Sequence, residues 1–154
     1  MAGPGYHDLP EGAEIAPRQY PVTRRDLVRY AGASGDFNVI HWNVRIAKSV
    51  GLPDVIAHGM LTMALAGRFL TEWAGDPGAV TEYGVRFSSP VVVPDDDKGA
   101  LVEIGGVVTG KLDGNRVTVD VTTRSGEAKV LTRAHAVVRL PAVLAQGGDP
   151  LEPP

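Results

Sequence analysis

The first half of the chain carries hydrophobic residues at helical spacing. Thr23 followed by Asp26 resembles a capping box in which Asp replaces the usual Glu, and it predicts a helix over residues 24–33 after a short strand at 20–22. A second short helix is predicted over residues 43–50, because a glycine and then a proline follow it.

The strongest helical pattern begins near Gly59 and runs to about Trp73. Its apolar side chains cover more than one stripe, so the pattern predicts a largely buried helix. Small residues such as Ala66 and Gly67 would let this helix lie close against a sheet. The wide apolar coverage comes from Met60, Leu61, Met63, Ala64, Leu65, Phe69, Leu70 and Trp73.

The second half of the chain, after a Gly-Asp-Pro-Gly turn at residues 75–78, has the pattern of β-strands. Val117, Val119 and Val121 alternate along the clearest of them and share one face. Turn residues between the strands are typical of hairpins. One buried helix followed by antiparallel strands predicts a single α+β domain, with a sheet wrapped around the helix. Strands are expected at 80–87 continuing into 90–93, 101–108, 116–123 and 129–140.

The composition narrows the classes of function. A length of 154 residues, 44% of them hydrophobic, suits one domain with a substantial core. The net charge of -3 and the scattered basic residues offer no basic surface for nucleic acid, so nucleic-acid binding is not expected. The chain has no cysteine, which excludes disulfides and thiolate chemistry.

The two ends of the chain carry no clear hydrophobic pattern. We expect a flexible N-terminal segment at 1–14 and a flexible C-terminal tail at 141–154, flanking one domain at 15–140. No secretory signal is visible, and no apolar stretch approaches the roughly 18 residues of a membrane span. A cytoplasmic protein without membrane contacts is therefore expected.

Asp36 and His41 are the first candidates for catalytic residues. A carboxyl and an imidazole held together can divide acid and base roles. On an α-helix their spacing would turn the side chains about 140° apart, so they converge only across irregular backbone, which Gly35 and Asn38 suit. Spacing alone favours a plainer alternative, in which Asp36 caps a helix and His41 lies on the surface.

The segment Ala-His-Gly-Met at residues 57–60 is the second candidate, because the long helix should begin there. The first amides of a helix lack internal partners and lie at the positive end of its dipole. Gly59 has no Cβ to obstruct an oxygen, so its amide could hold a carbonyl oxygen that gains negative charge. Alternatively, the glycine only permits tight packing. His58 is expected to be a structural hydrogen-bonding residue.

The sequence contains no motif that indicates metal binding or nucleotide binding. The four histidines show no ligand-like clustering in the sequence, so no metal site is predicted. His135 is expected to be structural, and the acidic run at 95–97 is expected to be a solvated turn. No glycine pattern for nucleotide binding or serine nucleophile is present.

Residues 30–47, YAGASGDFNVIHWNVRIA, resemble the signature of the MaoC-like, (R)-specific hydratase and dehydratase family. Val39 departs from it, since the family usually has proline there. The segments IAHGMLTM, GDPGAVTEYGVRF and PVVVP follow in the family's order. Within the family, the chain is most similar to the catalytic, HadB-like β subunits of actinobacterial (3R)-hydroxyacyl-ACP dehydratases. The matching signature residues are Tyr30, Ser34, Gly35, Asp36, Asn38, Ile40, His41 and Ala47.

This resemblance covers about residues 15–140 and implies a hotdog fold, an antiparallel sheet wrapped around a long central helix. It implies catalysis by Asp36 and His41, with Asn38 positioning the pair and the Gly59 amide binding the thioester oxygen. It further implies an acyl thioester substrate on ACP or CoA and no cofactor. The partner would be a second copy or another hotdog subunit, with the active site at the interface.

Overall fold

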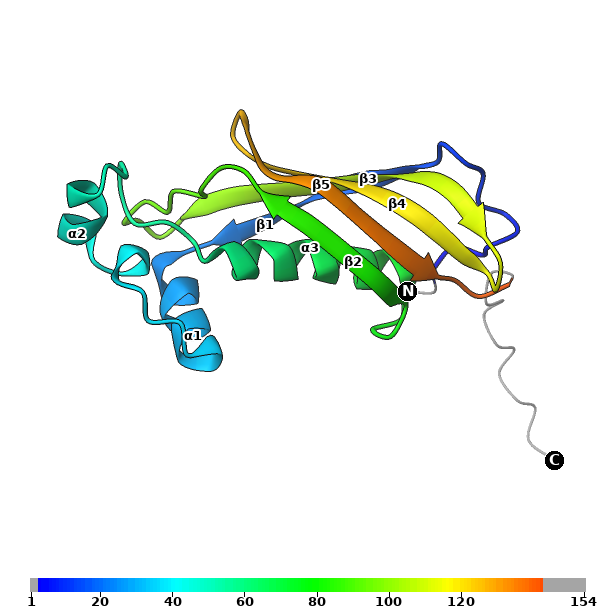
Figure 1. The fold of residues 1–154 in the computed structure, drawn as a ribbon, viewed down its shortest axis with the longest axis horizontal. Coiled ribbons are helices and arrows are strands. Elements are labelled where there is room, and N and C mark those ends of the chain that lie inside the picture. The colour runs from blue at the N-terminus through cyan, green and yellow to red at the C-terminus, as the bar shows by residue number, and fades with distance from the viewer. Residues whose placement is uncertain (1–2, 143–154) are drawn as a thin grey trace.

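A computed structural model describes residues 3–142 as one curved antiparallel sheet packed on a long helix (Figure 1). The strands are β1 (Glu14–Val22), β2 (Val80–Phe87), β3 (Ala100–Leu112), β4 (Arg116–Ser125) and β5 (Ala128–Arg139). The helices are α1 (Arg24–Ser34), α2 (Val44–Ser49) and α3 (Gly59–Ala74), with a 3-10 turn over Val39–His41.

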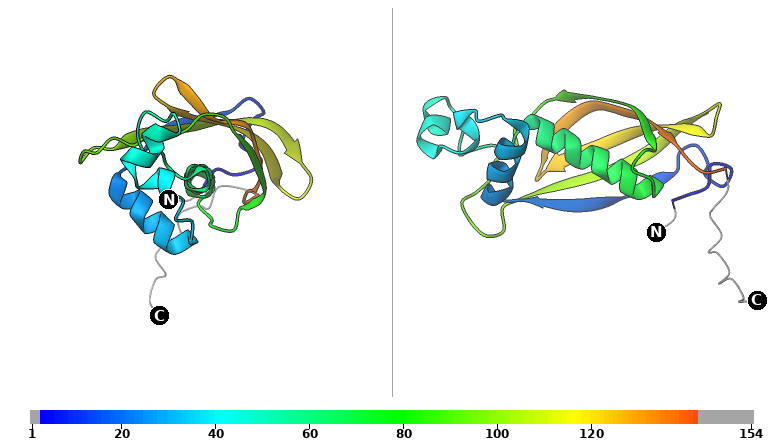
Figure 2. Two further views of the ribbon diagram at one scale, coloured as in Figure 1. Left: turned by 60° about the vertical axis from the view of Figure 1, so that its left-hand side comes forward. Right: turned by 90° about the horizontal axis from the view of Figure 1, so that it is seen from below.

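The sheet has the strand order β1-β3-β4-β5-β2, and every neighbouring pair is antiparallel. Strands β3, β4 and β5 form a meander, whereas β2 crosses to the far edge and pairs with β5. Seen nearly along the helix axis, the sheet curves around α3 (Figure 2). The predicted α+β hotdog arrangement is therefore confirmed.

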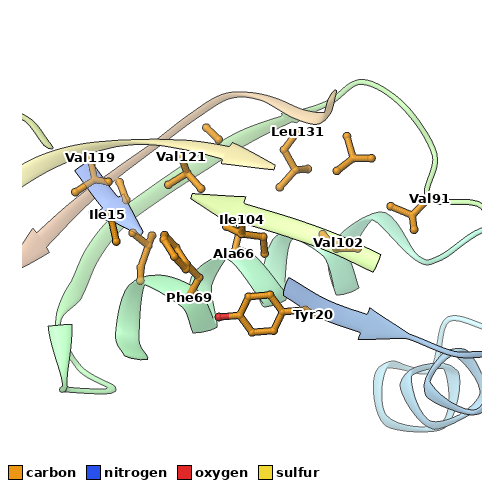
Figure 3. Close-up of a cluster of buried hydrophobic side chains, with 14 of the residues drawn as sticks. Ile15, Tyr20, Ala66, Phe69, Val91, Val102, Ile104, Val119, Val121 and Leu131 are labelled. Carbon is orange, nitrogen blue, oxygen red and sulfur yellow. The ribbon is translucent and has the colours of Figure 1, made fainter. Parts of the chain in front are cut away.

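One side of α3 and the inner face of the sheet form the core. Phe69 and Leu70 are fully buried, and Ala66 is small enough to let the helix approach the strands closely. In Figure 3, Phe69 lies among Ile104 and the valines of β4. Burying each large apolar side chain stabilises the fold by about 1.5–3 kcal/mol. Because these side chains hold α3 against the sheet, they also fix the position of its N-terminal end.

The prediction that α3 is largely buried is wrong for one side of the helix. Met60 is 56% exposed, and Ala64 is also exposed. Met63 and Gly67 on the same side are only half-buried. A single sheet covers one side of a helix, so the extra apolar residues remain uncovered in the single chain.

The prediction of a strand at residues 90–93 is also wrong. Of that segment only Val92 forms a bridge, and its partner is Ile56 in the loop before α3. Backbone hydrogen bonds run from Ala57 N to Val91 O (2.8 Å) and from Val93 N to Val55 O (3.0 Å). The segment therefore ties down the loop that enters α3, and it adds no strand to the sheet.

The helix start at Thr23 agrees with the sequence. The Asp26 carboxylate accepts hydrogen bonds from the Thr23 amide (2.9 Å) and hydroxyl (2.7 Å). The first strand begins at Glu14, well before the predicted start at residue 20. Here the side-chain pattern is weak, and pairing with β3 decides the strand.

Residues 3–13 contact the body of the domain. The Tyr6 amide donates to Pro141 O (2.8 Å), and the Gly12 amide donates to Val108 O (2.7 Å). The flexibility expected for residues 1–14 stays a prediction, and most of the expected tail at 141–154 lies outside the described residues. None of the helices within residues 3–142 is long and apolar enough to cross a membrane.

Candidate active site

The loop after α1 holds Asp36 in a defined orientation. Helix α1 ends at Gly35, whose φ of 76° turns the chain in a way that favours glycine. The Asp36 amide donates to the Ser34 hydroxyl (3.2 Å). The Asn38 amide donates to Asp36 Oδ1 (3.1 Å), which fixes one carboxylate oxygen. The other oxygen, Oδ2, faces His41.

His41 lies on the 3-10 turn and is buried, with only 7% of its surface exposed. Its Nδ1 lies 2.7 Å from the carbonyl oxygen of Ile56. A carbonyl can only accept, so Nδ1 must carry the hydrogen, and in the neutral ring Nε2 keeps its lone pair. That lone pair is on the side of Asp36 and is available to take a proton.

The distance from His41 Nε2 to Asp36 Oδ2 is 4.0 Å, too long for a direct hydrogen bond. Two hydrogen bonds that meet at a single oxygen span roughly 4–4.5 Å, so one water molecule or hydroxyl group fits between these atoms. The plainer alternative fails, because Asp36 caps no helix and His41 is not a surface residue. The structure brings the acid and the imidazole together.

Asn38 and Val39 shape the turn between the pair. The Asn38 side chain accepts a hydrogen bond from the Ile40 amide (3.3 Å), so it caps the 3-10 turn. Asn38 acts on Asp36 through its backbone amide. The Val39 amide donates no hydrogen bond within residues 3–142, so the proline that the family usually has there would cost the turn no hydrogen bond. The 3-10 turn nevertheless forms with valine at this position.

His58 is a buried, hydrogen-bonding residue, as predicted, but sequence reasoning missed its contact with His41. It is 1% exposed, and its ring stacks on the His41 ring with centroids 3.8 Å apart. Its Nε2 donates to the Asp36 carbonyl oxygen (3.0 Å), and the Tyr30 ring packs at 4.9 Å. His58 therefore connects both members of the pair to the start of α3. Only its place in the AHGM segment, beside Gly59, could have drawn attention to it.

The prediction that the histidines do not cluster is wrong in three dimensions. Asp36, His41 and His58 each offer a potential ligand atom, and these atoms lie within 4.8 Å of one another. However, His58 Nε2 must carry a hydrogen to face the Asp36 carbonyl, so its lone pair is not available on that side. The other ring nitrogen, Nδ1, is buried without a partner within residues 3–142 and is the atom that His58 could offer. The absence of a metal stays a prediction.

The buried ring of His58 is held neutral. Burial lowers the pKa of His58 below its usual 6.5, and the adjacent His41 ring lowers it further, whereas the hydrogen bond to Asp36 opposes the shift. The unfolded chain then binds the proton more readily than the folded chain. Stability from this residue is complete above pH 6.5 and is lost as the pH falls towards the lower pKa of the folded state.

We expect the melting temperature of the wild-type protein to fall more steeply between about pH 7 and about pH 5 than that of His58→Gln. Glutamine does not titrate, and its amide can still donate to the Asp36 carbonyl. Calorimetric or fluorescence melting at a series of pH values measures both curves. Parallel curves would show that His58 is not the group that titrates on unfolding.

A cavity of about 340 Å³ lies between the His41 turn, the start of α3 and the end of β2. Gly59 lines it, and the Gly59 amide makes no hydrogen bond within residues 3–142. A Cβ at Gly59 would lie 3.2 Å from the Phe87 ring, so this ring lies beside the glycine, which is itself exposed. The remaining lining is Ile40, His41, Ile56, Ala57, Thr62, Ser88, Ser89, Pro90, Val91, Val130 and Leu131.

The structure thus brings the four predicted site residues together at one cavity or directly beside it. His41 and Gly59 line it directly, Asp36 faces His41 from the neighbouring loop, and Asn38 holds Asp36. Another acid–imidazole pair, Asp120 and His135, is exposed on the sheet away from this cavity.

Fold and site define a hotdog protein with an acid–base pair beside a mainly apolar cavity. The chain belongs to the MaoC like domain family, whose model matches residues 9–127.

Three relatives illustrate this membership. The chain is 44% identical over 78 residues to 3-hydroxyacyl-thioester dehydratase X of Mycobacterium tuberculosis, covering 47% of this chain and 25% of that protein. It is 28% identical over 138 residues to the (R)-specific enoyl-CoA hydratase of Rhodospirillum rubrum, covering 89% and 92% of the two chains. The R-hydratase PhaJ1 structure from Pseudomonas aeruginosa has a TM-score of 0.81 and 26% identity, with 99% and 95% covered. The chain therefore matches only a quarter of the length of the mycobacterial relative.

Proposed function

We propose that the chain is a hydro-lyase that removes water reversibly from (3R)-3-hydroxyacyl thioesters to give trans-2-enoyl thioesters. One observation carries the proposal: the free lone pair of buried His41 faces Asp36 at a distance that fits one hydroxyl group, beside the cavity that Gly59 lines. The reaction is an acid–base elimination, so the proposal includes no cofactor.

Proton transfer and stabilisation of negative charge are carried out by different parts of the site. During dehydration His41 Nε2 takes the C2 proton, and Asp36 protonates the departing C3 hydroxyl group. The Gly59 amide donates to the thioester oxygen, which gains enolate-like negative charge as the C2 proton leaves. In hydration Asp36 takes a proton from water as its oxygen adds to C3. Because the pair can share one water molecule, the two residues act as a unit.

The proposal extends to the group that carries the acyl chain, which is either ACP or CoA. The resemblance of the combined segments to HadB-like subunits favours acyl-ACP in type II fatty acid synthesis, and hence a cytoplasmic site of action. The similarity to an (R)-specific enoyl-CoA hydratase favours acyl-CoA as the alternative, with a role in β-oxidation, polyester or polyketide metabolism. Comparing kcat/KM for one enoyl chain on ACP and on CoA distinguishes the two.

A hotdog partner, either a second copy or a different subunit, is also part of the proposal. The uncovered side of α3 bears Met60, and the apolar side chains of Phe37, Trp42 and Phe87 are more than half exposed nearby. Strand β2 is an edge strand with one unpaired side. Apolar surface and an open strand edge in such proximity are typical of a protein interface.

Gel filtration combined with an enoyl hydration assay tests the function and the assembly together. We expect the chain, alone or with a copurified hotdog subunit, to elute as a dimer that consumes crotonyl-CoA or crotonyl-ACP. Loss of the enoyl absorbance measures turnover across the peak. A dimer that binds acyl thioesters without hydrating any of them would instead identify a non-catalytic acyl-binding subunit.

A further inference from the structure

Thr62 places a hydroxyl group in the candidate active site that the proposed mechanism does not yet use. Its side chain lines the cavity beside Gly59, although the residue is only 4% exposed. Its hydroxyl makes no hydrogen bond within the described residues, 3–142. Within residues 3–142 the fully enclosed side-chain atoms without a partner are His58 Nδ1 and Thr123 Oγ1, so the Thr62 hydroxyl is not sealed off and is open to the cavity. A ligand in the cavity can therefore accept its hydrogen bond.

Helical threonines ordinarily bond to their own backbone. On the same helix, the Thr71 hydroxyl donates to the carbonyl of Arg68 (3.0 Å). The corresponding carbonyl for Thr62 is that of Gly59, and the one a residue earlier is that of His58, which accepts the amides of Leu61 (3.0 Å) and Thr62 (3.2 Å). Within residues 3–142 the Thr62 hydroxyl donates to neither carbonyl. The Thr62 hydroxyl therefore remains free to donate elsewhere.

The position of Thr62 on α3 directs this hydroxyl group towards Gly59. Residues three apart lie on the same face of a helix, and Cβ atoms tilt towards the helix N-terminus. The side chain of Thr62 thus covers the turn that begins with Gly59, where an amide without a partner lines the same cavity. The cavity is therefore lined within one helical turn by two residues that carry free hydrogen-bond donors, one in the backbone and one in a side chain.

We propose that the Thr62 hydroxyl donates a hydrogen bond to the thioester oxygen alongside the Gly59 amide, completing an oxyanion hole with two donors. The inference rests on the proposed dehydratase function and names a further catalytic residue for it. Thr62 keeps its proton throughout, because the C2 proton leaves to His41. Its hydrogen bond strengthens as the oxygen gains charge, so its effect falls on kcat and little on KM.

The test compares the near-isosteric Thr62→Val with Thr62→Ser and Thr123→Val. Thr123 on β4 has a fully buried hydroxyl without a partner within residues 3–142, and it does not line the cavity. For hydration of a crotonyl thioester, Thr62→Val is expected to lower kcat on the order of 100-fold. Thr62→Ser should retain most of the rate, and Thr123→Val should match the wild type. If Thr62→Val does not fold, Thr62→Ala replaces it.

An infrared measurement separates hydrogen bonding from packing. In the Asp36→Asn protein with bound crotonyl thioester, adding Thr62→Val should raise the frequency of the thioester carbonyl stretch, because one donor is lost. Unchanged kcat, a change confined to KM, or lost activity without the spectral shift would each overturn the assignment of Thr62. In those cases an active wild-type protein leaves the dehydratase proposal standing, whereas an inactive wild type overturns both.

Discussion

Asp36→Asn and His41→Asn are each expected to lower kcat for enoyl thioester hydration by about 100- to 10,000-fold, the range of a lost general acid or base. Asparagine at 36 keeps the size of the side chain and an oxygen for the Asn38 amide. Asparagine at 41 offers an amide nitrogen near the position of Nδ1, so the hydrogen bond to Ile56 can persist. Steady-state kinetics on each variant measure the loss.

The exposed pair Asp120 and His135, 2.6 Å apart, provides matched controls. Asp120→Asn and His135→Asn make the same chemical changes outside the cavity and should leave kcat unchanged. If Asp36 and His41 act as a unit, the double variant should be little worse than the poorer single variant. Near wild-type turnover by either Asp36→Asn or His41→Asn would contradict the proposed acid–base pair.

Gly59→Ala is expected to lower kcat/KM by on the order of 100-fold, because its methyl group intrudes where the thioester oxygen meets the amide. The added Cβ would lie 3.2 Å from the Phe87 ring, which is half exposed and can move. Stability should hold or increase, since alanine in a helix is favoured over glycine by up to about 1 kcal/mol. Kinetics and thermal melting of the same preparation separate the two effects.

Gly32→Ala is the control for the change in helix propensity. Gly32 lies within α1, is exposed, and has no atom within 4 Å of an added Cβ. This variant should gain similar stability and keep full activity. A Gly59→Ala protein that melts at a lower temperature and turns over normally would instead show that Gly59 serves only packing.

The sequence was informative wherever local rules decide the structure. The capping box at Thr23 and the alternating valines of β4 needed only neighbours along the chain, and both were predicted correctly. The positions of Asp36 and His41 around one turn followed from irregular backbone between them together with the family resemblance. These features depend on short-range geometry.

The features that sequence reasoning missed depend on contacts between distant segments. His58 stacks on His41, 17 residues earlier in the chain, and no local pattern encodes this contact. Residues 90–93 have the composition of a strand, yet they bond to the loop before α3. The uncovered side of α3 looked like core because its hydrophobic residues cannot indicate which surface will cover them.

Helix α3 has three roles in the proposed protein. One side packs in the core, its N-terminal turn holds the site, and its uncovered side is assigned to a partner. Substitutions near Gly59 should therefore be judged by activity and by assembly, measured on the same sample.

The stereochemical course of hydration tests the central claim most directly. The protein is incubated with a crotonyl thioester in deuterium oxide, and the released hydroxy acid is analysed by NMR and chiral chromatography. The account predicts (3R)-3-hydroxybutyryl thioester, with deuterium at C2 on the same face as the added hydroxyl group. A (3S) product, anti addition, or no hydration by the assembled protein would contradict it.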